Sequence, residues 1–563
     1  MYYSELKRAR DLLTGPGGDF EIVKAVVRGN EINTFKNAPK SVREFWLSSA
    51  QFAERPYIIY EDERLSYGET HKLAASVAAW LFAQGVNPGD RIAISMRNYP
   101  EWMVIYWGCL SVGITVVGMN AWWTAEEMSY GLKDAAPKVL FLDSERLERF
   151  KHISDVDPEM KVVGVRLPEY DDGVIPWSDV AAHGGDLPEV DVDPDSDASI
   201  FYTSGTTGFP KGAQLTHRGC IANLMNMAYA AASSALATQM ATGEAPPAEM
   251  PIPKTLLTTP LFHVTANNCG AYNTTAAGGA MYLMYRWDAG EALKLVEAEK
   301  LTGISGVPVM SRELINHPDF ATTDTSSLLA LSGGGAQVPP DLVQKIEDKV
   351  VTARPATGYG MTETCGIITS IAGDFFVDKP DSAGPYMPSF EAKCVDDDGN
   401  TVPQGELGEL WVKGSPVIKG YLNRPEATAE TITDGWLHTG DIARIDENGF
   451  IYIVDRKKDM IVTGGANVYP AEVEAALSEH PSVADVVVIG LSDPEWGRRV
   501  HAIVQLEKDV IGLSADELID YAGDRLARYK TPKSVELVTE IPRSEATKVN
   551  RSALVAAREV APG

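Results

Sequence analysis

A run rich in glycine and hydroxyl side chains, residues 203–212, is the feature that most constrains how this chain folds. It follows an apolar segment, residues 198–202, that is typical of a buried β-strand. Glycines let the backbone curl until several N–H groups face inward, and such a curl binds anions. Lys211 adds a positive charge near the end of the run. We therefore expect a phosphate-binding loop at the end of a strand.

This loop differs from the Walker A loop. Counting from Gly205, the sixth position is Pro210, where the Walker A motif has glycine. Gly212 stands where that motif has the Ser or Thr that binds magnesium. An ordinary surface turn is the alternative, because turns use the same residue types. Seven glycine or hydroxyl residues within this run of ten, with a lysine and a proline, favour the phosphate loop.

The chain has 563 residues, which predicts more than one domain. Residues 65–80 have a helical pattern, while residues 91–95 and 138–142 are typical of strands, and this alternation indicates sheets covered by helices. A helix at 472–477 and strands at 483–490 and 501–506 form a separate small α+β pattern. The sequence thus predicts an α/β protein with domains at residues 1–455 and 456–563.

The net charge of -28 opposes binding to nucleic acid and to anionic membranes. The five cysteines are scattered without metal-ligand spacing, which is typical of reduced thiols in a cytoplasmic protein, and the N-terminus lacks a signal-peptide layout. Residues 102–123 carry no charge and approach the length of a bilayer span. Their glycines favour a buried helix and strand over membrane contact, so we expect no integral membrane segment.

Small residues and prolines dominate residues 231–254. The pattern predicts a helix that runs into a surface loop. A neutral insertion is the favoured interpretation, because loops tolerate insertions at little cost. A cap near a substrate entrance is the alternative.

More motifs follow the phosphate loop in a fixed order. They are Phe262-His263, Gly333-Gly-Gly-Ala336, Gly358-Tyr-Gly-Met-Thr-Glu363, Gly405-Glu-Leu-Gly-Glu409, Trp436-Leu-His-Thr-Gly-Asp441, Asp455-Arg456, Gly464-Gly-Ala-Asn-Val-Tyr-Pro470 and Pro542-Arg-Ser-Glu-Ala-Thr-Lys548. Each is weak alone, but the ordered set resembles the adenylate-forming (ANL) superfamily, and within it the acyl-CoA synthetase or AMP-dependent acid–CoA ligase family.

The resemblance implies a fold and an activity. The fold is a large N-terminal domain of mixed α/β sheets with a distorted β-barrel subdomain, plus a small mobile α+β C-terminal domain. The activity is an ATP-dependent acid–CoA ligase, which adenylates a hydrophobic fatty, aromatic or alicyclic acid with release of pyrophosphate and then transfers the acyl group to coenzyme A with release of AMP. Magnesium is the implied cofactor, and a homodimer is one oligomeric state left open.

The resemblance also implies an ATP site. Its phosphate loop contains Thr203, Ser204, Gly205, Thr206, Thr207, Gly208 and Lys211. Gly334, Gly335 and Ala336 are expected along the adenine, with Tyr359 stacked on it and Gly360 and Met361 beside it. Asp441 and Arg456 are expected at the ribose hydroxyls, and Ile453 belongs to the same site.

The implied catalytic residues are Thr362 at the α-phosphate, Glu363 as the magnesium ligand, Lys548 and His263. Lys548 is expected to bridge the substrate carboxylate and the α-phosphate. Thr547 precedes it, where the family usually has glycine. A solvated surface lysine is the alternative for Lys548.

Two further sites are implied for the C-terminal domain. Lys458 occupies the hinge position, about which the small domain is expected to rotate. The coenzyme A site is expected at Gly464, Gly465, Trp496, Tyr529 and Lys533. A core tryptophan and solvated surface cations are the alternative for the coenzyme A residues.

The implied acyl pocket contains His263, Val264, Asn267, Gly306, Val307, Gly333 and Met361. Relatives that activate amino acids carry an aspartate where this chain has His263. A buried amine without such a carboxylate is costly, so amino acids are disfavoured as substrates. His263 itself is interpreted as either a gate or a packed histidine.

Two other functions stay open at the level of the sequence. One is an adenylate-forming enzyme with another acceptor, such as a carrier protein, oxygen or an internal hydroxyl. The other is a noncatalytic nucleotide-binding protein, which the near-complete set of motifs disfavours.

Overall fold

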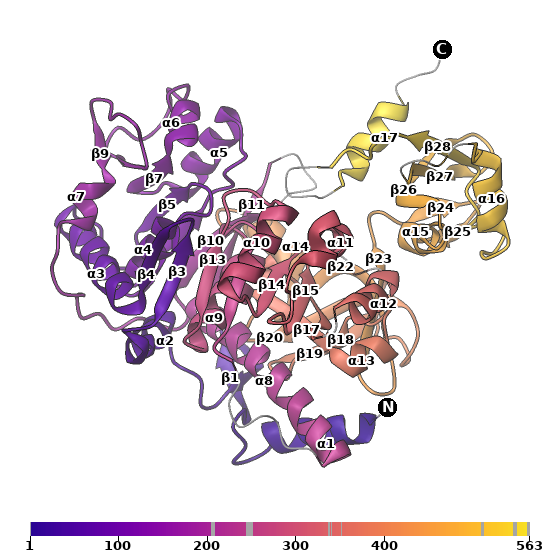
Figure 1. The fold of residues 1–563 in the computed structure, drawn as a ribbon, viewed down its shortest axis with the longest axis horizontal. Helices are drawn as coiled ribbons and strands as arrows, with labels where there is room; N and C mark the ends of the chain where they lie inside the picture. The colour runs from indigo at the N-terminus through magenta and orange to yellow at the C-terminus, as the bar shows by residue number, and fades with distance from the viewer. Residues whose placement is uncertain are drawn as a thin grey trace. The chain divides into compact units, whose positions relative to one another are not determined.

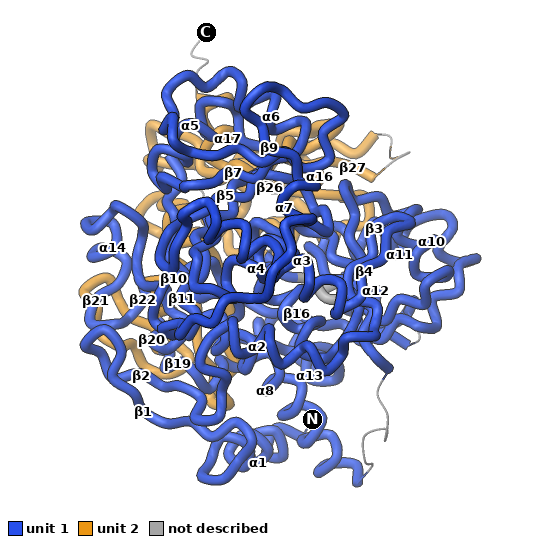
Figure 2. Tube along the Cα trace, turned by 90° about the vertical axis from the view of Figure 1, so that its left-hand side faces the viewer, with its two compact units in different colours: residues 1–392, 412–437 blue, residues 393–411, 438–563 orange. Residues whose placement is uncertain are grey.

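The computed structural model describes residues 2–559 except 204–208, 244–250, 336–337, 339, 351, 508–509, 511 and 544–548, and it also leaves out the side chains of residues 332–333 and 340–341. The chain forms two compact units, which Figure 2 colours separately. Unit 1 contains residues 1–392 and 412–437, and unit 2 contains residues 393–411 and 438–563. The predicted domain boundary at 455/456 marks the place about which the small domain is expected to rotate. A division into compact units does not test a rotation, so this boundary stays a prediction.

A seven-stranded sheet in unit 1 has the order β11-β10-β6-β5-β7-β8-β9 (Figure 1). Its strands are β5 (Arg91–Ser95), β6 (Thr115–Gly118), β7 (Val139–Asp143), β8 (Lys161–Val165), β9 (Val174–Pro176), β10 (Asp197–Thr203) and β11 (Lys211–Thr216). All neighbours are parallel except β11, which pairs antiparallel with β10. The strands predicted at 91–95, 138–142 and 198–202 are confirmed.

An eight-stranded sheet, also in unit 1, has the order β17-β16-β15-β14-β12-β13-β3-β4. Its strands are β3 (Pro56–Tyr60), β4 (Glu63–Ser66), β12 (Lys254–Leu257), β13 (Ala280–Leu283), β14 (Gly303–Gly306), β15 (Ala330–Gly334), β16 (Arg354–Met361) and β17 (Gly366–Ala372). The two edge strands are antiparallel to their neighbours and the inner strands are parallel. The carboxyl ends of the inner strands therefore share one edge of the sheet.

Helices of unit 1 lie against these sheets, and α1 lies beside α8 (Figure 1). The helices of this unit are α1 (Tyr3–Thr14), α2 (Val42–Ser48), α3 (Tyr67–Ala83), α4 (Pro100–Leu110), α5 (Ala125–Ala135), α6 (Ser144–Phe150), α7 (Trp177–Ala181), α8 (His217–Thr242), α9 (Tyr272–Ala276), α10 (Ala289–Glu299), α11 (Pro308–Asn316), α12 (Pro340–Lys349), α13 (Gly373–Asp378) and α14 (Pro425–Thr431). The predicted helix near 65–80 is α3, which starts at Tyr67 because Ser66 caps it and Glu69 completes a capping box.

The uncharged segment 102–123 is buried in the core of unit 1, as predicted. It forms α4 and β6, and the side chains of α4 pack with strands of both large sheets in one hydrophobic cluster. Trp107 stacks on Trp46 with ring centroids 5.0 Å apart and donates its indole N–H to the Tyr57 hydroxyl at 2.8 Å. In the described part of the chain, no helix combines the length and apolarity that crossing a bilayer requires.

Helix α8 contains the first part of the segment predicted as a helix that runs into a loop. It ends at Thr242, and Gly243 caps it with φ +74°, a left-handed conformation that favours glycine. The helical half of the prediction is confirmed. Residues 244–250 of the predicted loop lie outside the described residues.

Unit 2 contains a small α+β arrangement, which confirms the predicted class of the C-terminal part. Its sheet of three strands is β26 (Val483–Asp493), β27 (Gly497–Leu506) and β28 (Ser534–Val538), and its helices are α15 (Pro470–Ser478), α16 (Ala515–Gly523) and α17 (Arg551–Glu559). A short hairpin joins β24 (Ile461–Thr463) and β25 (Ala466–Val468). The predicted helix at 472–477 and both predicted strands are confirmed.

The remaining strands are short or lie at the junction of the two units in the sequence. They are β1 (Ile22–Val27), β2 (Asn30–Phe35), β18 (Gly384–Pro385), β19 (Phe390–Val395), β20 (Gly408–Gly414), β21 (Ile432–Thr433), β22 (Trp436–Ile445) and β23 (Phe450–Arg456). Strands β22 and β23 pair antiparallel. The predicted large part with mixed α/β sheets is confirmed, and the barrel subdomain stays a prediction.

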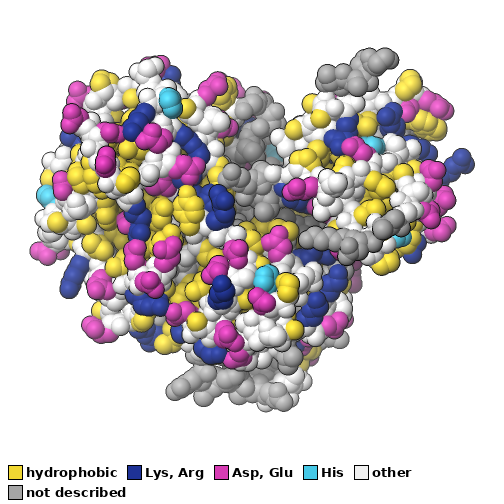
Figure 3. Space-filling view, turned by 45° about the horizontal axis from the view of Figure 1, so that its top comes forward, with side chains coloured by type: hydrophobic (Ala, Val, Ile, Leu, Met, Phe, Trp, Pro, Cys, Tyr) yellow, Lys and Arg dark blue, Asp and Glu magenta, His cyan; other side chains and the backbone are white. Residues whose placement is uncertain are grey.

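Acidic and basic side chains are interspersed on the face of the molecule that Figure 3 shows. The negative net charge is therefore spread over this face and does not form one patch of a single sign. Scattered carboxylates of this kind favour solubility and oppose binding to polyanions.

His217 makes the stability of the fold depend on pH, because its imidazole is buried at the start of α8. Its Nδ1 accepts a hydrogen bond from the Val42 backbone N–H at 3.3 Å. Burial lowers its pKa from 6.5 to about 3. Below pH 6.5 the unfolded chain therefore binds a proton that the folded chain does not bind.

We expect the free energy of unfolding to fall as the pH falls from 6.5 towards 3, with His217 contributing about 1.4 kcal/mol per pH unit. Urea unfolding at pH 6.5 and pH 5.0, followed by tryptophan fluorescence, measures this loss. His217→Gln should show a smaller loss between the two pH values than the unchanged protein. His152→Gln, at an exposed position, is the control and should behave like the unchanged protein. Equal losses in all three proteins would contradict the prediction.

Candidate active site

The carboxyl ends of β14, β15 and β16 lie side by side in unit 1. The register pairs Gly306 with Gly333 and Gly334 with Gly358. Met361 ends β16, and β12 on the other side of β14 leads into the segment with His263. Open α/β sheets bind ligands outside the carboxyl ends of their strands. The structure therefore brings the predicted acyl and adenine residues to one edge, called the glycine edge below (residues 306–307, 333–335 and 358–361).

The glycine edge has room for a flat ligand beside Gly334 and Gly335. A Cβ added to Gly334 would meet the Thr265 side chain at 3.9 Å, and one added to Gly335 would meet Thr265 and Val307 at 3.8 Å. Gly335 also has φ +76°. The described protein atoms thus leave room beside these two glycines, which fits the predicted adenine contact. Ala336 lies outside the described residues.

Backbone crowding fixes the end of β16. A Cβ on Gly360 would lie 1.9 Å from the Gly366 carbonyl oxygen, so only glycine fits there. The Thr364 hydroxyl accepts a hydrogen bond from the Met361 N–H at 3.1 Å and can donate to the Gly366 carbonyl at 2.8 Å. Hydrogen bonds that join Thr364 to the end of β16 and to the start of β17 therefore close the turn that carries Thr362 and Glu363.

Tyr421 joins the predicted phosphate lysine to the predicted magnesium ligand. Its hydroxyl donates to Glu363 Oε1 at 2.7 Å, and Lys211 Nζ lies 5.0 Å from the centre of its ring. Burial, together with the Glu363 carboxylate, raises the pKa of the Tyr421 phenol well above its usual value. Sequence reasoning missed Tyr421, because it stands outside the motifs and 58 residues from Glu363.

The ends of the predicted phosphate loop are held in place. Thr203 and Lys211 face each other across the β10–β11 ladder. Phe209 stacks on Tyr130 at 4.6 Å, and the Tyr130 hydroxyl donates to the Pro210 carbonyl at 3.0 Å. Tyr130 is a second residue that the motifs did not indicate. The predicted residues Ser204, Gly205, Thr206, Thr207 and Gly208 lie outside the described residues.

The segment after β12 carries three of the predicted acyl residues, His263, Val264 and Asn267. His263 packs on Phe262 with ring centroids 4.8 Å apart, and Trp122 meets Phe262 edge to face at 5.4 Å. Val264 is buried and precedes a π-helix, Thr265–Ala271, that contains Asn267. Helices of this type are frequent at functional sites. These three predicted acyl residues are therefore close along the chain and border the glycine edge through Thr265.

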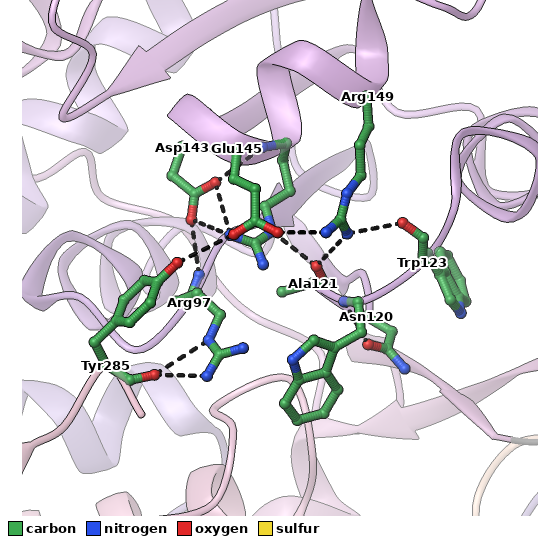
Figure 4. Close-up of polar contacts among 10 residues, drawn as sticks. Arg97, Asn120, Ala121, Trp123, Asp143, Glu145, Arg149 and Tyr285 are labelled. Carbon is green, nitrogen blue, oxygen red and sulfur yellow. Dashed lines mark hydrogen bonds and ion pairs between the residues drawn. The ribbon is translucent and has the colours of Figure 1, made fainter. Parts of the chain in front are cut away.

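A polar cluster in unit 1 fixes the loop that carries Trp122 (Figure 4). Arg146 Nε and Arg149 Nη1 donate to the Ala121 carbonyl at 2.7 and 2.8 Å. Arg146 also pairs with Asp143 at 3.1 Å, although both side chains are almost completely buried. Removing either partner would leave a buried charge.

Arg97 connects this cluster to the aromatic rings. Its backbone N–H donates to Asp143 at 3.1 Å, and its Nη2 donates to the Tyr285 carbonyl at 2.6 Å. The guanidinium lies 5.0 Å from the centre of the Trp122 ring. Since Trp122 packs on Phe262, the cluster supports the wall next to His263.

Asp441 and Arg456 meet in unit 2, as the sequence predicted for a shared ribose site. They are opposite in the β22–β23 register, and Arg456 Nε lies 2.8 Å from Asp441 Oδ1. Asp441 is 2% exposed, and its N–H donates to the Thr439 hydroxyl at 3.1 Å. Ile453 lies on β23 together with Arg456, and it is opposite Ala443 of β22.

The predicted hinge residue, Lys458, lies two positions after Arg456 in the sequence. Lys457, next to Lys458, pairs with Asp397 at 2.9 Å and with Glu409 at 3.3 Å, and its N–H donates to the Gly440 carbonyl at 2.8 Å. The role of Lys458 itself stays a prediction.

Two of the predicted coenzyme A residues are in contact within unit 2. The Gly464 N–H donates to the Trp496 carbonyl at 2.9 Å, and a Cβ on Gly464 would lie 2.5 Å from the indole. The Trp496 side chain is 46% exposed, so it is not a core residue. The Trp496 N–H donates to Asp493 Oδ1 at 3.0 Å and lowers the pKa of that carboxyl. The Lys533 N–H donates to the Val500 carbonyl at 2.9 Å, which places Lys533 beside β27.

Gly465 and Tyr529 complete the predicted coenzyme A set. Gly465 follows Gly464 in the β24–β25 hairpin with φ +82°. Tyr529 is 44% exposed, and the neighbouring Lys530 Nζ lies 5.6 Å from the centre of its ring. Lys530 pairs with Glu472 at 2.6 Å. An exposed ring beside a cation is available for stacking on a base.

Lys548 lies outside the described residues, but the chain is anchored on both sides of it. Arg543 pairs with Asp485 before it. Arg551 after it donates to Glu474 Oε1 and Oε2 at 2.7 and 2.9 Å. Burial raises the pKa of Glu474, so Arg551 compensates a carboxylate that is costly to desolvate. Sequence reasoning missed Arg551, which is 77 residues from its partner.

We expect Arg551→Met to lower the free energy of unfolding by about 2 kcal/mol, because it leaves Glu474 without its cation. The double variant Arg551→Met with Glu474→Met should recover most of this loss. Arg543→Met removes a more exposed ion pair and should cost less than about 1 kcal/mol. Urea unfolding of the four proteins measures the differences. If Arg551→Met and Arg543→Met have equal effects, the proposed role of Arg551 is wrong.

Family models match both parts of the chain. Residues 45–422 match the AMP-binding enzyme family, and residues 472–548 match the AMP-binding enzyme C-terminal domain. The first match alone covers more than half of the chain.

Individual relatives agree with these matches. A feruloyl-CoA synthase from Amycolatopsis sp is 36% identical over 487 residues, which are 86% of this chain and 92% of the relative. A long-chain-fatty-acid–CoA ligase from Bacillus subtilis is 33% identical, over 90% of this chain and 92% of the relative.

A solved structure gives the same result for the fold. The o-succinylbenzoate CoA synthetase from Bacillus subtilis, in complex with its acyl-adenylate intermediate, is 30% identical with a TM-score of 0.75, over 91% of this chain and 97% of that chain. The same enzyme has also been solved in complex with ATP and magnesium ion. This chain therefore belongs to the AMP-binding enzyme family and is an AMP-forming acid–CoA ligase.

Proposed function

We propose that this ligase activates a hydrophobic aromatic or fatty acid at the glycine edge, with the ATP phosphates between Lys211 and Glu363. The observation that carries the proposal is the bridge through Tyr421, which holds the predicted phosphate lysine and the predicted magnesium ligand together. The open face beside Gly334 and Gly335 supports a place for the adenine next to them.

The chemistry explains why such residues are needed. In the first step a carboxylate oxygen attacks the α-phosphorus of ATP, the bond to the β-phosphate oxygen breaks, and pyrophosphate leaves. In the second step the thiol sulfur of coenzyme A attacks the acyl carbon, loses its proton, and AMP leaves. Both partners in the first step are anions, so neutralising their charge and fixing their positions supplies most of the acceleration.

The residues present fit a magnesium ion that arrives with ATP. Magnesium is usually held by one or two carboxylates together with phosphate oxygens and water, and Glu363 offers one carboxylate. The ion would supply neutralisation of phosphate charge. Lys211 and Thr203 would contact the phosphates from the other side, and Tyr421 orients the Glu363 carboxylate through its hydrogen bond.

The acid itself is proposed from its surroundings. Val264, Gly306, Val307 and Met361 offer small or apolar contacts, and the wall beside His263 is aromatic. A relative at 36% identity is a feruloyl-CoA synthase and one at 33% is a long-chain-fatty-acid–CoA ligase. We therefore favour an aromatic acid first, a fatty acid second and an alicyclic acid third. His263 is proposed to border the acid as a packed or gating side chain.

The roles in unit 2 are proposed from the resemblance and from local contacts. Asp441 and Arg456 would bind the ribose, and Lys548 would neutralise the reacting carboxylate and α-phosphate. Rotation near Lys458, at the proposed boundary 455/456, would separate the two steps. The exposed Trp496 and Tyr529 would contact coenzyme A. We propose a cytoplasmic enzyme, and a homodimer stays a prediction.

Lys548→Ala tests the adenylation role. We expect the exchange of labelled pyrophosphate into ATP, dependent on one acid from an aromatic and fatty panel, to fall at least about a hundredfold, because charge neutralisation at the reacting centre is lost. ATP should still bind, as equilibrium dialysis can show. AMP release that requires coenzyme A identifies the acceptor in the unchanged protein. If no acid supports exchange in the folded protein with magnesium, the proposed function is wrong.

Tyr421→Phe tests the bridge. Loss of a hydrogen bond to a carboxylate should lower kcat/KM for magnesium-ATP by about tenfold, since such bonds contribute about 1.5–3 kcal/mol. The matched control is Tyr282→Phe, which breaks a similar bond to Glu299 at 2.9 Å on β13. The control should keep its kinetic constants. Unchanged kcat/KM in Tyr421→Phe would remove the main support for the phosphate site.

A further inference from the structure

The backbone that follows Thr362 and Glu363 is strained. Cys365 has φ +53°, in the left-handed region that residues with a side chain rarely adopt, and Gly366 has φ +145°. Cys365 lies in the turn between β16 and β17, and Gly366 is the first residue of β17. Conformations of this kind persist where the surrounding structure holds them, and they are frequent at functional sites.

Asn223, from the second turn of α8, holds one side of this turn. Its Oδ1 accepts a hydrogen bond from the Ile367 N–H at 2.8 Å, and its Nδ2 donates to the Asn268 carbonyl at 3.2 Å. A Cβ added to Gly366 would lie 2.2 Å from Asn223 Oδ1. The Asn223 amide therefore occupies the space that glycine leaves.

Asn268, from the π-helix, holds the other side. Its Nδ2 donates to the carbonyl of the strained Cys365 at 3.0 Å. Asn223 and Asn268 are both completely buried. Because the first amide also donates to the Asn268 carbonyl, the two side chains form one continuous link from α8 through the π-helix to the turn.

The link joins the three segments that the proposed function uses. Helix α8 starts directly after β11, whose first residue is Lys211. The π-helix starts two residues after His263. The turn carries Thr362 and Glu363. A buried hydrogen-bonded link with all of its partners on these segments is placed to transmit the position of one segment to another.

We infer that Asn223 and Asn268 are positioning residues, which hold the strained turn so that Glu363 presents its carboxylate to the magnesium of ATP. The inference rests on the proposed function of Glu363. Neither side chain is required to touch a substrate. Their effect should therefore appear in the response to magnesium more than in the affinity for the acid.

Asn223→Leu tests the inference, because leucine keeps the branched outline of the side chain and makes neither hydrogen bond. The measurement is the magnesium concentration for half-maximal pyrophosphate exchange into ATP, with the best acid at saturation. We expect this concentration to rise at least fivefold in the variant, while KM for the acid changes less than twofold.

Asn226→Leu is the matched control. Asn226 lies on the same helix, is also completely buried, and accepts a hydrogen bond from the Ser389 hydroxyl at 2.9 Å without contacting the turn. It should lose stability in the same way but keep the magnesium response of the unchanged protein. Equal magnesium responses in the two variants would overturn the inference, since the loss would then be structural.

Asn268→Leu keeps the test decisive if Asn223→Leu fails to fold. It removes the donor to Cys365 and should raise the half-maximal magnesium concentration in the same direction. In the double variant, the rise in the half-maximal magnesium concentration should be smaller than the product of the two single-variant rises, because both residues act on one turn. A full multiplicative effect, or no effect of Asn268→Leu, would contradict the shared link. If the unchanged protein supports exchange, these outcomes concern the positioning role alone.

Discussion

The shared edge formed by the parallel strands β12, β14, β15 and β16 is the constraint on which the rest of unit 1 depends. Parallel pairing fixes which residues are neighbours where the strands end, and here it pairs Gly306 with Gly333 and Gly334 with Gly358. Glycines at these positions leave the backbone there uncovered by side chains of their own. A ligand can then contact the backbone directly, and the surrounding turns supply the charged and hydroxyl groups.

Local patterns were enough to predict much of this arrangement. The strand 91–95 coincides with β5, and the strand at 198–202 lies within β10, because short apolar runs bounded by turns depend on near neighbours in the chain. The motifs also placed Asp441 and Arg456 at one expected ribose site, and the pairing of β22 with β23 brings these two residues, 15 positions apart, into contact. Both cases involve patterns that are complete within a short stretch of sequence.

Residues that act across long separations were not predictable in the same way. Tyr421 contacts Glu363 from 58 residues away, and Asn223 contacts Ile367 from 144 residues away. Tyrosine and asparagine are common in many environments, so neither residue carries a local signal. Their positions follow from how α8 and the turn after β16 pack, which is a property of the tertiary structure. The same applies to Arg551 and Glu474 in unit 2.

These long-range contacts share a physical role. A carboxylate that binds magnesium must keep its orientation while a highly charged nucleotide enters and leaves. Tyr421 fixes the Glu363 side chain through one hydrogen bond, and the amides of Asn223 and Asn268 fix the backbone behind it. Neutral hydrogen-bonding groups can do this without adding charge to the site. Lys211 and Lys548, both proposed, would then remain the cations that neutralise the reacting anions, so orientation and neutralisation would be supplied by different residues.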